Sequence, residues 1–471
     1  MQSSIKKNFV YRSALTLSTY IMGLITFPYI SRVLGVEKLG LVNFVDNTIN
    51  YFLLFATMGI GLIGIREIAS VKDDKEKCSK VFSNILGLNV IFTAATLIVY
   101  FLLILLVPKL NQYSELFYLG AAKILFTAFM IEWFYTGIED FKYITIRSII
   151  VKIIYVISIF LLVKQPEDYL LYFIFTVGVI IINAIINIIY VNKHVNIIWR
   201  ELFNLRYIKQ NITLGIYAIM SSMYLTFNVM YLGLATTNVQ VGYYTTAFKL
   251  YSIILGIISS FTNVMMPRMS ILLANNNKED FYALINKSLT LIITISIPLI
   301  VFSIIMAPHI VRIISGMGYE GAVIPMQVIM PSIILVGIAQ VFTIQILIPM
   351  EADRILLFAS IIGALVSLSF NVLIVPSWGS IGSALVLLFS ELVVTITYAI
   401  YCNRTYRVNI FNLINTRTTV SSLLLYIAVC SISSVYIRNV YTMLVVSLFL
   451  MIGIFILYNI KLIKSQLKYG K

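Results

Sequence analysis

The stretch QNITLGIYAIMSSMYLTFNVMYLGLATTNVQVGYYTTAFKLYSIILGIISSFTNVMMPR, residues 210–268, decides the class of fold. It is long enough for two membrane-crossing helices of about 20 residues each. Between Lys209 and Arg268 its one charged side chain is Lys249. A lysine at membrane depth costs about 2.5–3.5 kcal/mol, and such residues usually face a protein interior or a watery cavity. Lys249 is therefore a candidate for holding an anion, which favours a chain that moves a substrate over one that only spans the bilayer.

The rest of the chain has the same character. Of its 471 residues, 60% are hydrophobic and 11% are charged, and the mean hydropathy is +0.97. A soluble domain of this size would cover itself with polar side chains. Apolar runs of about 20 residues recur along nearly the whole length, so we predict an all-α integral membrane protein. The predicted transmembrane helices, about fourteen, are 13–31, 41–65, 82–107, 116–138, 147–163, 169–191, 212–235, 243–266, 288–308, 322–348, 355–375, 380–401, 419–436 and 441–460.

The positive charge is placed on one side of these spans. If the N-terminus is cytoplasmic, 25 of the 34 Lys and Arg residues fall in cytoplasmic loops and tails, six fall outside and three lie within spans. This asymmetry is the positive-inside rule, so the net charge of +15 sets orientation and does not indicate nucleic acid. We expect a multi-pass protein with both termini in the cytoplasm.

The chain repeats itself weakly at an offset near 202. Gly40 corresponds to Gly242, and Arg66 corresponds to Arg268. Each half holds six predicted spans, an even number, so the two halves would be parallel repeats around a central transport cavity. The predicted parts are an N-terminal six-helix lobe (1–205), a C-terminal six-helix lobe (206–405), and an appended two-helix hairpin with a basic cytoplasmic tail (406–471).

Polar side chains follow one face of the first two spans of each predicted lobe, at steps of three and four residues. The candidate substrate-binding residues from these stripes are Asn43, Asp46, Asn47, Asn50, Tyr217, Ser221, Tyr224, Asn228, Lys249 and Ser252. Small polar residues also let membrane helices pack closely, so each stripe alone has a structural reading. By the repeat, Asn47 corresponds to Lys249, and we hypothesise an ion pair between Asp46 and Lys249 across the cavity.

Other charged residues complete the set of candidates. Glu391 lies in the middle of its span and is expected either to couple transport to an ion, as Asp46 could, or to make a buried hydrogen bond. Lys123 and Lys152 could snorkel to a surface, as Lys249 could, and Glu132 lies nine residues from Lys123, out of phase for pairing within one helix. Two arginines at span ends are also kept as candidates for the cavity. Arg32 lies outside, against the positive-inside trend, and Arg268 is most simply a topology anchor.

Few residues are available for catalysis or metal binding. The chain has three cysteines without ligand spacing and two histidines, and it has no Gly-rich phosphate loop or Ser/His/Asp set. We therefore expect no enzyme activity, no metal site and no cofactor, and we leave open coupling to a proton or sodium gradient.

Three segments resemble a known family. They are FPYISRVLGVEKLGLVNF (27–44), WFYTGIEDFKYITIRSII (133–150) and VGYYTTAFKLY (241–251), which runs on to MMPRMS (265–270). These segments look like those of the polysaccharide-biosynthesis lipid flippases of the multidrug/oligosaccharidyl-lipid/polysaccharide superfamily, and they keep the family's order. The family often carries a cation in the third motif, where this chain has Lys249.

The resemblance implies a function. Such proteins move an undecaprenyl-diphosphate-linked oligosaccharide, such as an O-antigen repeat unit, from the inner to the outer leaflet of the bacterial cytoplasmic membrane. They work by alternating access of two lobes around a V-shaped cavity, without nucleotide hydrolysis. The expected partners are this lipid-linked substrate, the membrane lipids and a polymerase of the same pathway, with no nucleic acid.

Two other functions are alternatives. A cation-coupled drug antiporter of the same superfamily would need acidic residues in its cavity, where this chain offers Lys249 with Asp46 as the nearby acid. A membrane-embedded polysaccharide polymerase or ligase would need a large external loop with catalytic groups, and the predicted external loops are short.

Overall fold

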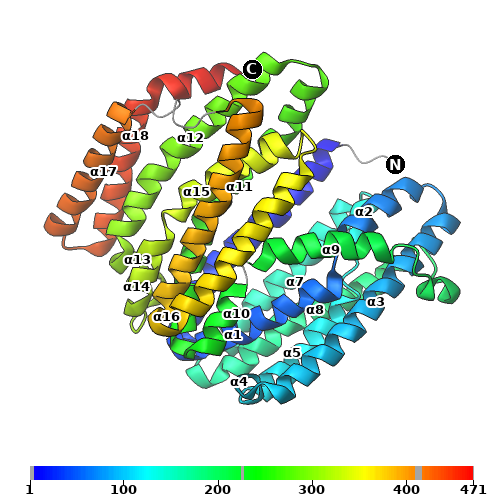
Figure 1. Ribbon diagram of the computed structural model, residues 1–471. Coiled ribbons are helices and arrows are strands. Elements are labelled where there is room, and N and C mark those ends of the chain that lie inside the picture. The colour runs from blue at the N-terminus through cyan, green and yellow to red at the C-terminus, as the bar shows by residue number, and fades with distance from the viewer. Residues whose placement is uncertain (1–4, 224–226, 409–415, 470–471) are drawn as a thin grey trace. The chain divides into compact units, whose positions relative to one another are not determined.

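The computed structural model describes residues 5–223, 227–408 and 416–469, and their regular elements are all helices (Figure 1). Within these ranges, ten helices are long and apolar enough to cross a membrane, or eleven if the bent pair Glu320–Ile329 and Ser332–Leu347 forms one span. The predicted all-α membrane fold is therefore confirmed, and the chain is a multi-pass membrane protein.

Two helices are too long for one crossing. Helix α1 (Ile5–Thr57) has 53 residues and α16 (Asp353–Tyr406) has 54. At 1.5 Å per residue each would extend about 80 Å, whereas the hydrocarbon core is about 30 Å thick. Each is interrupted by a glycine with positive φ, Gly35 at 70° and Gly379 at 52°. Helix α16 covers the predicted spans 355–375 and 380–401, whereas α1 covers 13–31 and only the first part of 41–65, so the total of fourteen stays a prediction.

The chain divides into two compact units, Met1–Gly242 and Tyr243–Lys471. In the first unit α1 packs against α3, α5, α7 and α10. The remaining elements of this unit are α2 (Ile60–Val71), α3 (Lys75–Leu106), α4 (Pro108–Asn111), α5 (Ser114–Thr127), α6 (Glu132–Gly137), α7 (Phe141–Leu162), η1 (Pro166–Asp168), α8 (Tyr169–Val191), η2 (Trp199–Phe203), α9 (Ile208–Met223) and α10 (Phe227–Ala235).

The second unit continues from α11, which begins in the first. Its elements besides α16 are α11 (Asn238–Ala274), α12 (Lys278–Ile305), α13 (Ala307–Ser315), η3 (Glu320–Ala322), α14 (Val323–Ile329), α15 (Ser332–Gln340), η4 (Val341–Leu347), α17 (Thr416–Tyr436) and α18 (Val440–Tyr469). The last two helices form the predicted C-terminal hairpin and pack on α12 (Figure 1). Tyr426, Cys430 and Met451 of the hairpin are buried there against Val301.

The predicted lobes 1–205 and 206–405, with the appended hairpin and tail 406–471, follow from the sequence repeat, whereas the two units reflect packing. In the first unit α9 and α10 pack against α1, although the repeat assigns them to the C-terminal lobe. The lobe boundaries and the repeat itself stay predictions.

The two glycines that the repeat pairs meet in the first unit. A Cβ on Gly40 would lie 1.9 Å from the Asn238 carbonyl oxygen and 2.8 Å from the Gly242 amide nitrogen. A Cβ on Gly242 would lie 2.3 Å from the Val36 carbonyl oxygen. The start of α11 thus touches α1 backbone to backbone, which membrane helices achieve by placing small residues at the contact.

Helix starts in the loops follow ordinary capping rules. Asp74 precedes α3 and accepts hydrogen bonds from the backbone N–H groups of Glu76 and Lys77, both at 3.1 Å. The bond from the Lys77 backbone is the main reason that the pKa of Asp74 is below its usual value. This fixes where the chain turns from the loop after α2 into α3.

Candidate functional site

In the first unit, the part of α1 after Gly35 contributes two residues to a polar triad, in which each of the three side chains is bonded to the other two. The Lys123 ammonium, on α5, donates to Asp46 Oδ1 at 2.6 Å and to Asn50 Oδ1 at 2.7 Å. Asn50 Nδ2 in turn donates to Asp46 Oδ2 at 3.0 Å. The side chain of Lys123 is 8% exposed and that of Asp46 is 22% exposed. Each charge therefore has an opposite charge and an amide as partners, which is how buried ions are tolerated.

The triad changes two predictions. We predicted that Lys123 could snorkel, but it is buried and paired within the unit. We also predicted Lys249 as the partner of Asp46, whereas the partner in the structure is Lys123. Asp46 and Lys123 are 77 residues apart, so helical spacing could not link them. The available signal was that both lie near the start of spans predicted to begin on the same side, 41–65 and 116–138.

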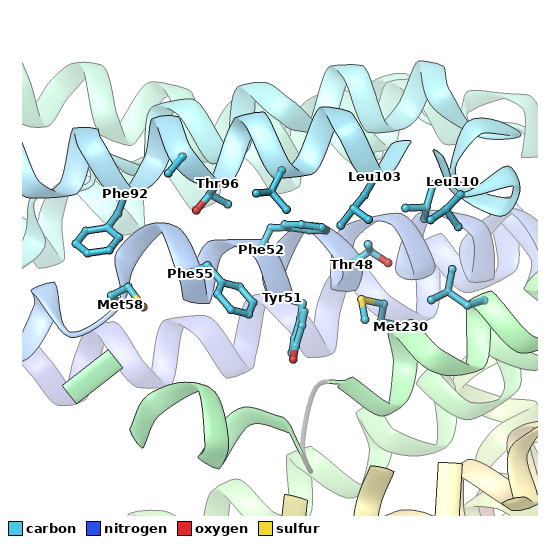
Figure 2. A pocket seen from close by; sticks show the side chains of 14 residues that line it. Thr48, Tyr51, Phe52, Phe55, Met58, Phe92, Thr96, Leu103, Leu110 and Met230 are labelled. Carbon is cyan, nitrogen blue, oxygen red and sulfur yellow. The ribbon is translucent and has the colours of Figure 1, made fainter. Parts of the chain in front are cut away.

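An apolar groove lies on another face of the same segment (Figure 2). Its volume is about 480 Å³. Figure 2 shows Tyr51, Phe52 and Phe55 of α1 on one side of the groove, with Phe92 and Leu103 of α3 on the other. The lining residues are Thr48, Tyr51, Phe52, Phe55, Met58, Phe92, Ala95, Thr96, Val99, Leu103, Val107, Leu110, Met230 and Leu234. Such a surface suits a hydrocarbon chain, because it offers few hydrogen-bonding groups.

The other candidate residues of the first unit differ in what the structure shows of their side chains. Asn47 Nδ2 donates to the Asn43 carbonyl of its own helix at 2.8 Å, as in ordinary helix packing. Asn228 is buried within α10. Tyr224 and the side chains of Tyr217 and Ser221 lie outside what the structure describes. The substrate roles of all these residues stay predictions.

A second buried charge network joins α6, α7 and α8. Arg147 forms an ion pair with Glu132 and hydrogen bonds to Asn187 Oδ1 and Ser148 Oγ. Arg147 is the first residue of the predicted span 147–163 and was not among the candidates, because nothing in its own segment shows that Glu132 and Asn187 lie beside it. Lys152, also on α7, donates to Thr19 Oγ1 of α1 at 2.5 Å. The triad and the Arg147 network thus both connect helices within the first unit.

Lys249, in the second unit, differs from Lys123 in the surroundings of its ammonium group. It is partly buried in α11, and within the described ranges its ammonium has no hydrogen-bond or ion-pair partner. Ser252, one turn on, donates to the Lys249 carbonyl at 2.8 Å. Two further turns along α11, Ser259 Oγ accepts a hydrogen bond from Gln340 Nε2 of α15 at 2.8 Å. The far part of the stripe thus packs helices, while no residue that the structure describes compensates the charge of Lys249.

Three other candidates are placed by the structure. Glu391 is 4% exposed in α16, and no side chain of the described ranges is bonded to its carboxyl group. Arg32 and Arg268 are exposed at the surface of their units. A binding role for each of the three stays a prediction.

Comparisons with known proteins agree with the sequence resemblance. A family model described as "Polysaccharide biosynthesis protein" matches residues 5–273. A protein of Escherichia coli (strain K12), named as a candidate O-antigen transporter, is 26% identical over 400 residues, covering 83% of this chain and 95% of its own. A protein of Shigella dysenteriae with the same name is 24% identical over 402 residues, covering 83% and 98%.

Solved structures match the fold. The lipid II flippase MurJ, in an inward closed conformation, matches with a TM-score of 0.80 over 98% of this chain and 100% of its own, at 14% identity. An inward-facing multidrug resistance transporter of the MATE family, in the MOP superfamily, matches with a TM-score of 0.63 over 86% of this chain and 99% of its own, at 13% identity. At such identities these matches establish the architecture.

Proposed function

Because the chain belongs to the polysaccharide biosynthesis protein family, whose model matches 5–273 of its 471 residues, we propose that it is a lipid flippase. Its substrate is an undecaprenyl-diphosphate-linked oligosaccharide, a polysaccharide or O-antigen repeat unit. It moves this lipid from the inner to the outer leaflet by alternating access and catalyses no covalent chemistry. The relatives named as O-antigen transporters support this choice of substrate.

The observation that carries the proposal is the apolar groove beside the polar triad on one helix. The substrate is an amphiphile with a long hydrocarbon tail, a diphosphate and sugars. A groove of about 480 Å³ with apolar walls can take part of the tail. The C-terminal hairpin, α17 and α18, is a second candidate for binding the tail.

The groove can be tested with a matched pair of variants. Ala95 lines the groove and Ala94, its neighbour on α3, does not, and both are exposed. Ala95→Trp is expected to fill the groove and lower flipping of lipid-linked oligosaccharide in proteoliposomes, while Ala94→Trp should leave it near wild type. Equal activity of the two variants would remove the groove from the substrate path.

We assign the diphosphate to Lys249. A diphosphate is a dense anion, and a cation outside bulk water attracts it strongly. Lys123 is less suited, since Asp46 already compensates its charge. Substrate entry from the cytoplasmic side follows from the predicted orientation, with both termini in the cytoplasm of a bacterial cell and the protein in its inner membrane. A polymerase of the same pathway would then use the flipped product.

The function as a whole is tested by deleting the gene and analysing the membrane lipids. A flippase defect leaves the complete lipid-linked repeat unit in the membrane, because its synthesis continues while its transfer stops. Loss of the repeat unit itself would instead point to an enzyme of its synthesis, and the flippase assignment would be wrong. Direct flipping by purified protein in proteoliposomes completes the test.

A cation-coupled antiporter is the second candidate. The buried Glu391 carboxyl, unbonded within the described residues, is the observation that favours it, since a carboxyl can exchange a proton or sodium ion. The same group could couple flipping to an ion gradient. Drug efflux that is lost in Glu391→Gln, together with normal lipid-linked intermediates in the deletion strain, would favour the antiporter.

A further inference from the structure

A pocket of about 440 Å³ lies between the first turns of α7 and the last turns of α8, within the first unit. It is distinct from the groove on α1 and from the polar triad. Its lining residues are Asp140, Lys142, Tyr143, Ile146, Arg147, Ile150, Val151, Ile186 and Tyr190. Both helix ends belong to the predicted cytoplasmic side of the membrane.

One end of the pocket is built from a rigid aromatic pair. The rings of Tyr143 and Tyr190 are stacked, with centroids 3.8 Å apart and planes at 10°. Asp140, which caps α7, accepts the backbone N–H of Tyr143 at 3.2 Å and the Tyr190 hydroxyl at 3.1 Å. Tyr143 also donates its hydroxyl to the Ile186 carbonyl at 3.1 Å. These bonds fix the positions of both rings at this end of the pocket.

Cations surround this pair. The Arg147 guanidinium lies 5.5 Å from the Tyr143 ring centroid, and the Lys193 ammonium lies 5.1 Å from that of Tyr190. Because the two rings cover each other's inner faces, the cations lie on the outer sides of the stack. Lys142 is exposed at the pocket's rim.

The charged groups that line the pocket or contact its aromatic pair, together with Glu132, sum to one positive charge. Arg147 is paired with Glu132, and Asp140 supplies a second negative charge against Lys142 and Lys193. The neighbouring Lys72–Glu139 pair is neutral, with its atoms 2.9 Å apart. One surplus positive charge suits a ligand that carries a single negative charge, such as a phosphodiester.

The other end of the pocket is apolar and open to the membrane. Ile146 is 45% exposed and Ile150 is 52% exposed, although both are large aliphatic residues. Along α7 the exposed aliphatic surface continues through Ile153, Ile154 and Ile157. Exposed isoleucines at this spacing form a lipid-facing strip, so a ligand at the polar end would meet hydrocarbon at the other.

We propose that this pocket binds one anionic phospholipid of the inner leaflet, with its phosphodiester beside Lys142 at the polar end, where Lys193 on the Tyr190 ring adds positive charge, and an acyl chain along Ile146 and Ile150. The combination of a surplus cation, a fixed aromatic pair and a membrane-exposed aliphatic wall matches the two ends of such a lipid. A free phosphate would occupy the polar end alone, and a neutral lipid would not compensate the surplus positive charge.

The charge contribution is tested with the full-length protein in nanodiscs. Native mass spectrometry should detect retained phosphatidylglycerol in competition with phosphatidylcholine. Retention should fall about tenfold or more in Lys142→Gln/Lys193→Gln, since each lysine near a membrane surface contributes several-fold. Lys278→Gln, an exposed lysine on α12 that is also on the predicted cytoplasmic side, is the control and should bind as wild type does. Equal retention by the double variant and wild type would overturn the proposal.

The acyl-chain contribution has its own matched pair. Ile150 and Ile157 are both 52% exposed on α7, and of the two Ile150 lines the pocket. Ile150→Trp should lower retention several-fold, and Ile157→Trp should not. If soluble glycerol phosphate displaces phosphatidylglycerol at equal concentration, the site is a phosphate site rather than a lipid site, and the proposal is wrong.

Discussion

Each unit has a lysine within a membrane-crossing helix, Lys123 in the first and Lys249 in the second, and the two differ in how their charge is compensated. In the first unit Lys123 is held by Asp46 and Asn50 at 2.6 and 2.7 Å. In the second unit Lys249 is partly buried and, among the described residues, has no partner for its charge. A compensated lysine stabilises the packing of its helices, whereas an uncompensated one leaves its charge available to a ligand.

Whether a buried lysine has a partner for its charge distinguishes a structural lysine from a substrate-binding one better than its depth in the membrane does. Removing one member of a buried ion pair leaves the other uncompensated and costs about 3–5 kcal/mol. Removing a lysine without a partner leaves nothing uncompensated, so its loss should appear in transport and not in stability. The following predictions test that distinction.

The largest effect is expected for Asp46→Ala, which leaves the Lys123 ammonium buried without its carboxylate. We expect a loss of about 3–5 kcal/mol in the free energy of unfolding, measured by thermal or denaturant unfolding in detergent. The control is Asp46→Leu/Lys123→Met, which removes both charges and should restore most of the stability. If the single variant unfolds as wild type does, the ion pair is not what holds α1 against α5.

Asn50→Ala should have the next largest effect. Asn50 accepts from Lys123 and donates to Asp46, so the variant loses two hydrogen bonds to charged groups while the ion pair stays. One hydrogen bond to a charged group contributes about 1.5–3 kcal/mol. Because the remaining Lys123–Asp46 pair still compensates both charges and Asp46 is 22% exposed to water, we expect the two losses together to stay in that range, below the effect of Asp46→Ala. The measurement is the same unfolding experiment, and a loss as large as that of Asp46→Ala would show that the amide matters as much as the carboxylate.

Lys249→Ala should reduce flipping about tenfold or more, equivalent to about 1.4 kcal/mol, with an unchanged unfolding midpoint. The readout is transfer of lipid-linked oligosaccharide in proteoliposomes at matched protein levels. Lys249→Arg keeps the charge and is the control, which should retain most of the activity. Unchanged flipping in Lys249→Ala would remove this lysine from the mechanism, and lost stability would give it a structural role instead.

The sequence predicted the fold class well and the contacts poorly. Apolar runs and charge asymmetry reveal membrane helices because they depend on each segment alone. Helical periodicity showed that Asp46 and Asn50 share a face, and they do bond to each other. It could not show that Lys123 completes the triad, or that Arg147 binds Glu132, because these contacts depend on how separate helices pack. Partners across helices follow from tertiary packing, which one sequence without relatives does not encode as a local pattern.

The smallest effect is expected for Asn47→Ala, and it decides whether the predicted repeat extends to function. By the offset near 202, Asn47 corresponds to Lys249, yet its amide donates to the Asn43 carbonyl of its own helix. Losing one such bond should cost about 0.5 kcal/mol of unfolding free energy, and flipping should stay within about twofold of wild type. The same unfolding and proteoliposome measurements apply. A flipping defect as large as that of Lys249→Ala, without a stability change, would place both residues on the substrate path and would mean that uncompensated charge is not what distinguishes Lys249.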